Sequence, residues 1–258
     1  MTENEGIRGL IDYWKDFKMV GGEPHVHPDD REIMGKRAQT NASYSERSSA
    51  EAFFELPAHD QTCGFHLSLM PVPYMGNLES ADIFLLMVNP SLGYADYGTN
   101  ATQSFRAALS RNLKQEFAAG GEQCVALDPE YWWSSWFIYY ERLLRRTVRE
   151  YANAEKISYL QSLNTLSRRL AILELVPYYS ANASQITKPF LKRLKSAQRA
   201  IKAGQELARK AEARDATVIV RWSDRWNLGS ARGIISNTSP NGFRIGHEAI
   251  LKRLLSKQ

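Results

Sequence analysis

Four short apolar segments, separated by longer stretches with helical character, constrain the fold of this 258-residue chain more than any other feature. The segments are rich in apolar and β-branched residues, and they lie at residues 82–88, 170–176, 216–222 and 233–236. Such strands are typical of parallel sheets, which are covered on both faces by crossover helices. Helices are expected within residues 101–120, 131–152 and 187–214. The pattern predicts a three-layer α/β/α domain with a central, four-stranded, mainly parallel sheet.

The first 70 residues have a different character. Apolar residues recur at helical spacing within residues 5–17, and a short helix is expected near residues 50–56. Turn-rich and polar stretches separate these two segments. We predict a helical and irregular N-terminal extension at residues 1–70, followed by the α/β domain at residues 71–258.

Charge and cysteine content narrow the class of protein only a little. Lys and Arg outnumber Asp and Glu by 33 to 28, a net charge of +5, which permits a polyanionic partner without identifying one. The two cysteines, Cys63 and Cys124, supply neither a disulfide framework nor a thiolate metal site. No apolar stretch approaches the roughly 20 residues of a membrane span or a signal peptide's apolar run. We expect a soluble, cytoplasmic monomer with no membrane partner.

Polar motifs follow two of the predicted strands directly. Segment 82–88 runs into Asn89-Pro90-Ser91, and segment 233–236 runs into Asn237-Thr238-Ser239-Pro240. Ligands of parallel α/β sheets bind at the carboxyl ends of the strands. Both motifs are therefore expected at the same edge of the sheet, where they would form a binding site.

The two motifs together resemble those of the uracil-DNA glycosylase superfamily, especially its thymine- and mismatch-specific branch. In that branch a strand runs into Gly-Ile-Asn-Pro-Gly. The second motif of the superfamily, His-Pro-Ser-Pro-Leu-Ser or Asn-Pro-Ser-Gly-Leu-Ser, follows the last strand and is similar to residues 237–242. The lead-in Pro73-Tyr74-Met75-Gly76 is also similar to the Pro-Tyr-x-Gly of relatives. The resemblance covers roughly residues 70–255. It implies a monofunctional DNA glycosylase that flips a pyrimidine and hydrolyses its glycosidic bond without a metal or cofactor.

The resemblance implies specific roles for the motif residues. Asn89 would position the attacking water through its amide oxygen, with Pro90 fixing it, and Asn237 and Ser239 would complete the catalytic set. Ser91 stands where strict uracil enzymes carry a Tyr that blocks substituents at C5 of the pyrimidine. A small residue here predicts a pocket that tolerates a C5 group.

The second motif departs further from the family pattern. Thr238 replaces a Pro, and Asn241 replaces the Leu that wedges into the duplex in relatives. A polar side chain is a poor wedge, so Phe243 or Arg244 is an alternative candidate for the wedge. Another alternative is a substrate whose bases are already loosely paired and need no wedge.

Several residues are candidates for the wall of a base pocket, because a flipped base stacks on aromatic rings. These candidates are Tyr94, Tyr97, Phe105, Tyr178 and Tyr179, with Ser180 beside them and Glu174 ending the second strand. Tyr is equally common as a half-buried packing residue, and the sequence does not choose among them. The aromatic block at residues 131–144 is interpreted mainly as core and secondarily as part of a substrate wall.

A basic stretch within residues 187–202 is predicted to form one helix that contacts DNA phosphates. Its cations include Lys188, Lys192, Arg193 and Lys195, and its apolar residues available for burial are Phe190, Leu191, Leu194 and Ile201. An ordinary solvated helix face is an equally good interpretation.

A histidine motif offers an alternative function, that of a metal-dependent hydrolase. His25-x-His27-x-Asp29-Asp30 resembles the ligand spacing of metallo-β-lactamase-type hydrolases. In those enzymes the motif follows a buried strand, whereas here turn residues precede it, so a loop with two exposed histidines is the simpler interpretation.

The implied substrate is a modified pyrimidine. Some members of the superfamily excise modified cytosines, including glucosylated hydroxymethylcytosine, from phage DNA in antiviral defence. The chain resembles that branch in having a small residue, Ser91, at the position that would face a bulky C5 substituent. The alternatives are uracil or mismatch repair, and a DNA-binding module on the same fold that has lost catalysis.

Overall fold

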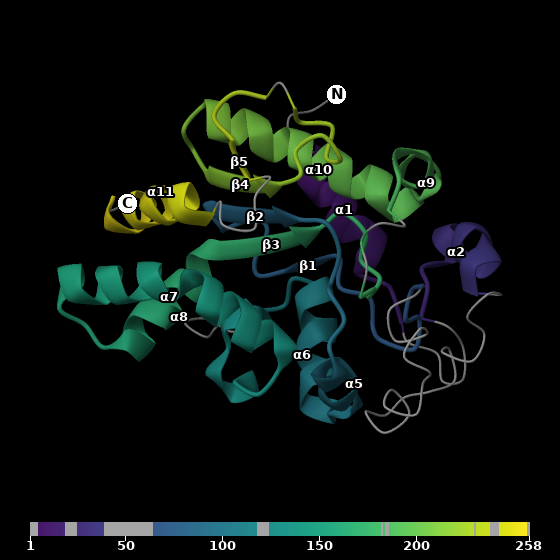
Figure 1. The fold of residues 1–258 in the computed structure, drawn as a ribbon, viewed down its shortest axis with the longest axis horizontal. Helices are drawn as coiled ribbons and strands as arrows, with labels where there is room; N and C mark the ends of the chain where they lie inside the picture. Colours follow the sequence, from purple (N-terminus) through teal and green to yellow (C-terminus); the bar gives the residue numbers. More distant parts are fainter. Residues whose placement is uncertain are drawn as a thin grey trace.

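The computed structural model describes residues 5–18, 25–38, 64–117, 124–181, 183, 186–229, 231–237 and 243–256. A mixed five-stranded sheet with strand order β1-β3-β2-β4-β5 forms the centre of this part of the chain (Figure 1). The strands are β1 Tyr74–Met75, β2 Ile83–Met87, β3 Leu170–Glu174, β4 Thr217–Arg221 and β5 Ile235–Asn237. Every residue of β2 and β3 is buried, as the apolar composition of these segments predicts.

The four predicted strands are present and parallel, but the prediction of a four-stranded sheet is wrong. β1 adds a fifth strand, which pairs antiparallel to β3 with Tyr74 opposite Leu173. Two residues are too short to give a sequence pattern, and tertiary contacts hold them in place. The Asn112 amide bridges the Gly76 N–H and the Tyr74 carbonyl at 2.9 and 2.7 Å, and Gly76 has a φ of +89°.

The helices of the described residues are α1 Glu5–Trp14, α2 Arg31–Ala38, α5 Tyr94–Ala101, α6 Gln103–Leu113, α7 Ser135–Glu155, α8 Tyr159–Arg169, α9 Lys188–Arg193, α10 Lys195–Glu212 and α11 Phe243–Leu255. Three single turns of 3-10 helix accompany them: η1 Pro28–Asp30, η3 Val125–Leu127 and η4 Pro129–Tyr131. None of the helices in these ranges is both long and apolar enough to cross a bilayer.

The prediction of one continuous basic helix over residues 187–202 is wrong. The segment forms α9 and α10, which are separated by Leu194 with extended backbone angles (φ −79°, ψ 115°). Leu194 is fully buried, and Phe190 and Leu191 are at most 5% exposed. Ile201 is half-buried. The buried Asp30 accepts the Ser196 N–H at 3.2 Å in the first turn of α10, so a new helix begins after Leu194 with one of its free N–H groups satisfied.

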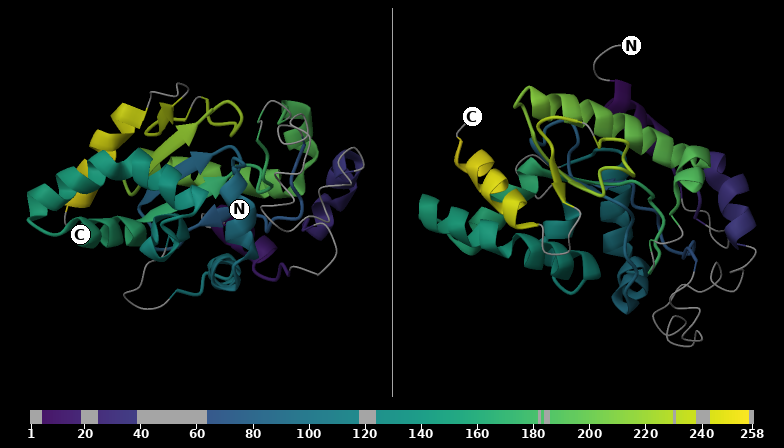
Figure 2. Two further views of the ribbon diagram at one scale, coloured as in Figure 1. Left: turned by 60° about the horizontal axis from the view of Figure 1, so that its bottom comes forward. Right: turned by 45° about the horizontal axis from the view of Figure 1, so that its top comes forward.

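Helix α1 packs along α10, as the views in Figure 2 show. Its first turn is held by Glu206, whose Oε2 accepts the backbone N–H groups of Gly6 and Ile7 at 3.0 and 2.9 Å. A carboxylate at a helix N-terminus satisfies N–H groups that have no partner within the helix. Leu10 and Trp14 of α1 belong to the buried core, so this N-terminal helix shares the core of the sheet.

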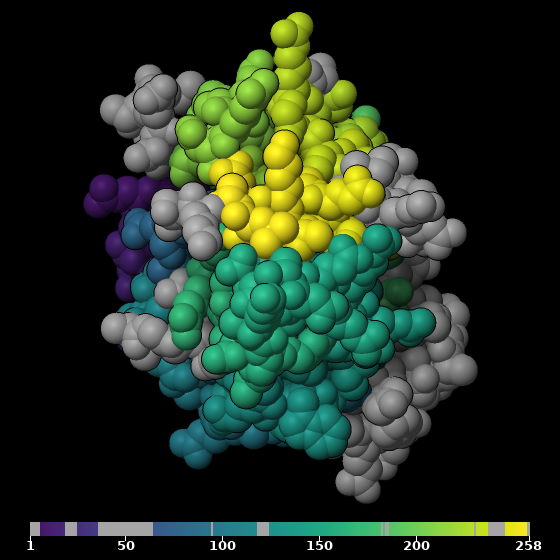
Figure 3. Space-filling model, turned by 90° about the vertical axis from the view of Figure 1, so that its left-hand side faces the viewer, coloured from purple at the N-terminus to yellow at the C-terminus, as the bar shows by residue number. Residues whose placement is uncertain are grey.

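The connections around β2 create a crevice at the carboxyl edge of the sheet. From β2 the chain passes through α5 to α8 into β3, which lies on one side of β2, and then through α9 and α10 into β4 on the other side. Parallel sheets bind ligands where neighbouring connections diverge in this way. On another side of the molecule α11 packs against α7 (Figure 3) and joins the C-terminal segment to the sheet.

Helix α10 approaches the loop after β4 closely at Gly204. A Cβ at this position would lie 2.9 Å from Cε3 of the buried Trp226 ring. We expect Gly204→Ala to lower the free energy of unfolding by about 1–3 kcal/mol, because overpacking outweighs the ~1 kcal/mol by which Ala favours a helix. Gly98→Ala is the matched control, since open space surrounds Gly98 within α5, and it should be neutral or stabilising. Urea unfolding of both variants measures their free energies of unfolding. Equal changes in the two variants would show that the Trp226 ring can move away from the added methyl group.

Candidate functional site

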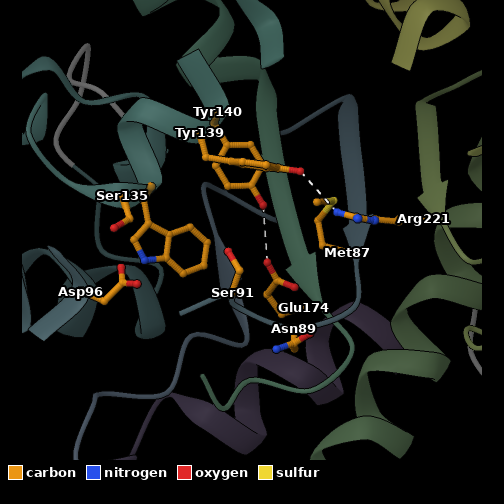
Figure 4. Close-up of a pocket in the computed structure, with 10 residues that line it drawn as sticks. Met87, Asn89, Ser91, Asp96, Ser135, Tyr139, Tyr140, Glu174 and Arg221 are labelled. Atoms are coloured by element: carbon orange, nitrogen blue, oxygen red, sulfur yellow. Dashed lines mark hydrogen bonds between the residues drawn. The ribbon is translucent and has the colours of Figure 1, made fainter. Parts of the chain in front are cut away.

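A pocket of about 270 Å³ opens at the carboxyl ends of β2, β3 and β4. Its lining comes from these strands, from the segment after β2 and from the first turns of α7 (Figure 4). The lining residues are Met87, Asn89, Ser91, Asp96, Ser135, Trp136, Tyr139, Tyr140, Glu174 and Arg221. At about 30 Å³ per water, this volume holds roughly nine waters, which suits a small ring system better than a larger ligand.

Asn89 is held in one orientation at the end of β2. Its amide nitrogen donates to the Pro90 carbonyl at 2.9 Å and to the Ser180 carbonyl at 3.2 Å. Ser180 N also donates to the Pro90 carbonyl at 3.1 Å, which joins the chain after β3 to the chain after β2. Because both amide N–H groups are used by the backbone, Oδ1 is the group that Asn89 can present to a ligand.

The aromatic wall of the pocket is rigid. Trp136 and Tyr140 stack with ring centroids 5.9 Å apart and an interplanar angle of 12°, and both are buried. The Trp136 indole donates to the Tyr179 hydroxyl at 2.9 Å, and Tyr139 meets Tyr140 edge to face. Tyr139 is 41% exposed and lies at the rim, where the Arg221 guanidinium donates to its hydroxyl at 3.4 Å.

Glu174 is a buried carboxyl group on the wall of this pocket. Its side chain is 2% exposed, and the Tyr140 hydroxyl donates to Oε1 at a long 3.4 Å. Oε2 is buried and has no hydrogen-bond partner in the part of the chain that the structure describes. Burial raises the pKa of Glu174 well above its usual range, while the Tyr140 hydrogen bond and the Arg221 charge act in the opposite direction. A buried polar atom without a partner is uncommon in native proteins, and a bound ligand or water would supply the missing hydrogen bond.

Asp96 is the second buried carboxyl group of the pocket. Its Oδ2 accepts the Gly93 N–H at 2.6 Å and so caps α5, and Ser135 also donates to it. Oδ1 is buried and, within the described ranges, has no partner. Burial raises the pKa of Asp96 to about 7, against the lowering effect of Gly93 and Ser135. Asp96 therefore keeps its proton to a higher pH than an exposed Asp does.

Several residues expected in a base pocket are packing residues that do not line this one. Tyr97 is buried with its hydroxyl 2.7 Å from His66 Nδ1, and Phe105 packs edge to face on Tyr131. The Tyr178 hydroxyl donates to Asp30 at 2.7 Å. Tyr179 lies behind the wall and holds the Trp136 indole, and Ser180 contributes its carbonyl to Asn89.

The remaining motif residues lie at the edge of the described chain. The backbone of Asn237 ends β5 opposite Arg221, next to the pocket, but its side chain is not among those that the structure describes. The same holds for the side chains of Tyr94, Phe243 and Arg244, while Ser239 and Asn241 are outside the described residues altogether.

The predicted DNA-binding cations Lys188, Lys192, Arg193 and Lys195 are all exposed. Lys188 and Lys192 line a second pocket beside the loop after β4, whereas Arg193 and Lys195 do not. None of the four lines the first pocket.

His27 is committed to local structure. Its ring stacks on Tyr13 with centroids 3.7 Å apart, Nε2 lies 3.0 Å from the Tyr13 carbonyl, and Nδ1 accepts the Asp29 N–H. With both ring nitrogens occupied, His27 caps η1 instead of presenting a ligand atom. Among the described residues, no group of three His, Cys, Asp or Glu side chains is placed to hold a metal ion.

The sequence pattern locates the strand end, and the aromatic block at residues 131–144 contains four of the lining residues. It does not predict Asp96 or Arg221, because nothing in their local sequence marks them as neighbours. Glu174 has a usable signal, since a carboxyl group within a strand that is buried on both faces needs an explanation. Trp136 belongs to the aromatic block, whose secondary interpretation is a substrate wall.

Comparisons of this chain with protein-family models, with curated proteins and with solved structures find no match.

Proposed function

We propose that this protein is a monofunctional DNA glycosylase of the uracil-DNA glycosylase type, which flips a modified pyrimidine into the first pocket and hydrolyses its N-glycosidic bond. The three-layer arrangement predicted from the sequence pattern, and its uracil-DNA glycosylase-like form implied by the resemblance, are part of this proposal. The three-layer arrangement is supported by the four parallel strands and by helices α8 and α10, which contact the neighbouring strands β3 and β4. The observation that carries the proposal is the fixed amide of Asn89 in a pocket with aromatic walls.

The amide has the properties that glycosidic hydrolysis requires. Loss of the base leaves an electron-poor sugar carbon, which a weak nucleophile attacks once it is correctly placed. Asn89 Oδ1 would accept a hydrogen bond from the attacking water and orient its oxygen toward C1′ of the sugar. Because the Asn89 N–H groups are bound to the Pro90 and Ser180 carbonyls, the amide does not reorient during the reaction.

Glu174 supports a cytosine-type base over uracil. Uracil can depart as an anion whose charge spreads over two carbonyl groups, whereas cytosine departs more easily after it gains a proton at N3. A buried, protonated Glu174 would donate that proton as the C1′–N1 bond breaks and its electron pair passes to the base. The water then adds to C1′ and releases its proton, which restores Glu174, so that one water is consumed for each base released.

The size of the pocket restricts where a large substituent can lie. A volume of about 270 Å³ accommodates a pyrimidine ring, but a glucosyl group more than doubles the heavy atoms of the base. The sugar of a glucosylated hydroxymethylcytosine must therefore extend through the opening. Ser91 is both exposed and part of the lining, so it marks a side of the pocket through which a C5 substituent would pass.

The second sequence motif begins with Asn237, the last residue of β5. The Asn237 backbone pairs with Arg221, a residue of the first pocket. This placement of Asn237 supports its contribution to the site, and the contribution of Ser239 is proposed from the sequence motif.

The test is base release from DNA of defined composition. Unmodified, uracil-containing, hydroxymethylated and glucosylated DNA would be incubated with the protein, and abasic sites would be detected by alkaline strand cleavage. We expect release of modified cytosine. Release of uracil alone would select the repair alternative, and tight binding without any abasic site would select the binding module.

Ser91→Tyr tests the proposed path of the C5 substituent. A phenol at the opening should lower release of the glucosylated base by about 10²-fold or more, because it occupies the space that the sugar needs. Release of an unsubstituted base should fall far less. Ser135→Ala, which changes another polar residue of the same lining without adding volume, is the control. Equal release of bulky and small bases by Ser91→Tyr would contradict this path.

A further inference from the structure

The second pocket is comparable in size to the first, at about 270 Å³, and it has a different chemical character. It lies between the α9–α10 segment and the loop that follows β4. Its polar lining consists of three cations, one carboxylate and two amides, namely Lys188, Lys192, Arg225, Asp224, Gln198 and Asn227. This excess of positive charge and N–H donors suits a small anion.

Arg225 is the fixed cation of the second pocket. Its Nη1 donates to the Ala183 carbonyl at 3.1 Å, and its guanidinium lies 4.2 Å from the centroid of the Trp222 ring. Trp222 has a φ of +57°, a left-handed conformation that is strained for a bulky residue. Strain of this kind persists where the surrounding structure enforces it, and it concentrates at ligand-binding sites.

The same tryptophan connects the two pockets. Arg221, which lines the first pocket, lies 5.8 Å from the Trp222 ring, so two arginines from different pockets contact one indole. The loop is anchored by Trp226, which is fully buried and donates to the carbonyl of Met87 at 3.0 Å. Met87 itself lines the first pocket, so the positions of both pockets depend on the end of β2.

We propose that the second pocket binds a phosphodiester group of the same DNA strand whose base occupies the first pocket. The inference rests on the proposed function for the identity of the strand. A phosphate here would be held by Arg225 as the preorganised donor and by Lys188 and Lys192 as flexible charges. Arg221 of the first pocket and Arg225 of the second both contact the Trp222 ring, so one loop would hold the base site and the phosphate site together.

Asp224 opposes this binding and so provides a sensitive test. It lies 3.9 Å from Lys188, and both side chains are about two-thirds exposed, at 64% and 68%. An exposed pair of this kind is weak, so Lys188 can leave it for a phosphate. Asp224→Asn removes the only carboxylate among the described residues that line this pocket and should tighten DNA binding about three- to fivefold at low salt.

The main experiment compares two double variants with the same change in charge. Lys188→Ala with Lys192→Ala removes two cations from the second pocket, whereas Arg193→Ala with Lys195→Ala removes two exposed cations beside it. The probe is a fluorescein-labelled, single-stranded DNA oligonucleotide of unmodified bases, titrated at several salt concentrations. The first variant should bind more weakly and lose up to about 0.7 units of salt slope, because the pocket would hold one phosphate and each phosphate contact on a single strand contributes ~0.7. The second variant should keep the wild-type slope.

Equal losses of DNA affinity and salt slope in both double variants, or unchanged DNA affinity of Asp224→Asn, would overturn the second pocket as a phosphate site. The binding readout does not depend on catalysis, so the two proposals fail separately. If the pocket variants lose DNA affinity but the wild type releases no base, the phosphate site stands and the glycosylase proposal fails. If the wild type releases the base normally and the pocket variants bind DNA like the wild type, the glycosylase proposal stands and the phosphate site fails.

Discussion

Asn89→Ala is expected to reduce base release by at least about 10²-fold while the protein remains folded, because the substitution removes the group that would place the water. Asn89 is only half-buried, and the two lost hydrogen bonds contribute about 0.5–1.5 kcal/mol each to the free energy of unfolding. Single-turnover release measured with saturating protein separates this loss from any change in DNA affinity. A folded Asn89→Ala protein with near-normal release would remove this residue from the mechanism.

Asn89→Asp is a sharper version of the same test. A carboxylate also accepts hydrogen bonds from water, but it has no N–H groups to donate to the Pro90 and Ser180 carbonyls. Repulsion from these two oxygens should turn the side chain away from its present position. We therefore expect Asn89→Asp to be nearly as inactive as Asn89→Ala. Full activity of the Asp variant would show that orientation by the backbone carbonyls is unimportant.

Glu174→Gln is expected to lower release of a cytosine-type base by about 10²- to 10⁴-fold, the range of a lost general acid. Gln has nearly the same shape and still accepts the Tyr140 hydrogen bond, but it cannot give up a proton. Release by the wild type should fall as pH rises through the pKa of Glu174, which burial places above the usual range. This decline should be absent from the Gln variant. Asp96 and Arg221 remain in both proteins, so the difference between the two profiles reports Glu174.

Stability provides the control for Glu174→Gln. Because the folded-state pKa of Glu174 is raised, the carboxyl group favours the folded state fully only below its unfolded pKa, and this contribution is lost as pH rises. A Gln side chain does not ionise, so the Gln variant does not lose stability in this way. It should be at least as stable as the wild type at pH 8. Loss of activity together with equal or greater stability would identify a catalytic role. An active Gln variant would leave Glu174 with a structural role alone.

The sequence by itself determined the parallel part of the sheet and one end of the site. Strands buried on both faces require apolar runs, and a run is a local property of the chain, so the positions of β2, β3, β4 and β5 all follow from the sequence pattern. The end of such a strand is equally local, which is why the sequence alone assigns Asn89 and Ser91 to a pocket.

Only the tertiary structure decided which side chains meet Asn89. The wall residues Trp136, Tyr139 and Tyr140 come from the start of α7, and Glu174 comes from the neighbouring strand. Tyr178 and Tyr97 satisfy every local criterion for a base-stacking residue, yet their hydroxyl groups find buried partners in Asp30 and His66.

The same physical reason accounts for the other differences between expectation and structure. β1 is held in place by Asn112, a residue of α6, and the helix that begins after Leu194 has its Ser196 N–H bound by Asp30, a residue of η1. The pKa of Glu174 likewise depends on burial and on Tyr140 and Arg221, which are distant in the chain. Burial and hydrogen-bond partners are properties of the packed molecule, so the apolar pattern could locate the edge of the sheet but not the chemistry assembled there.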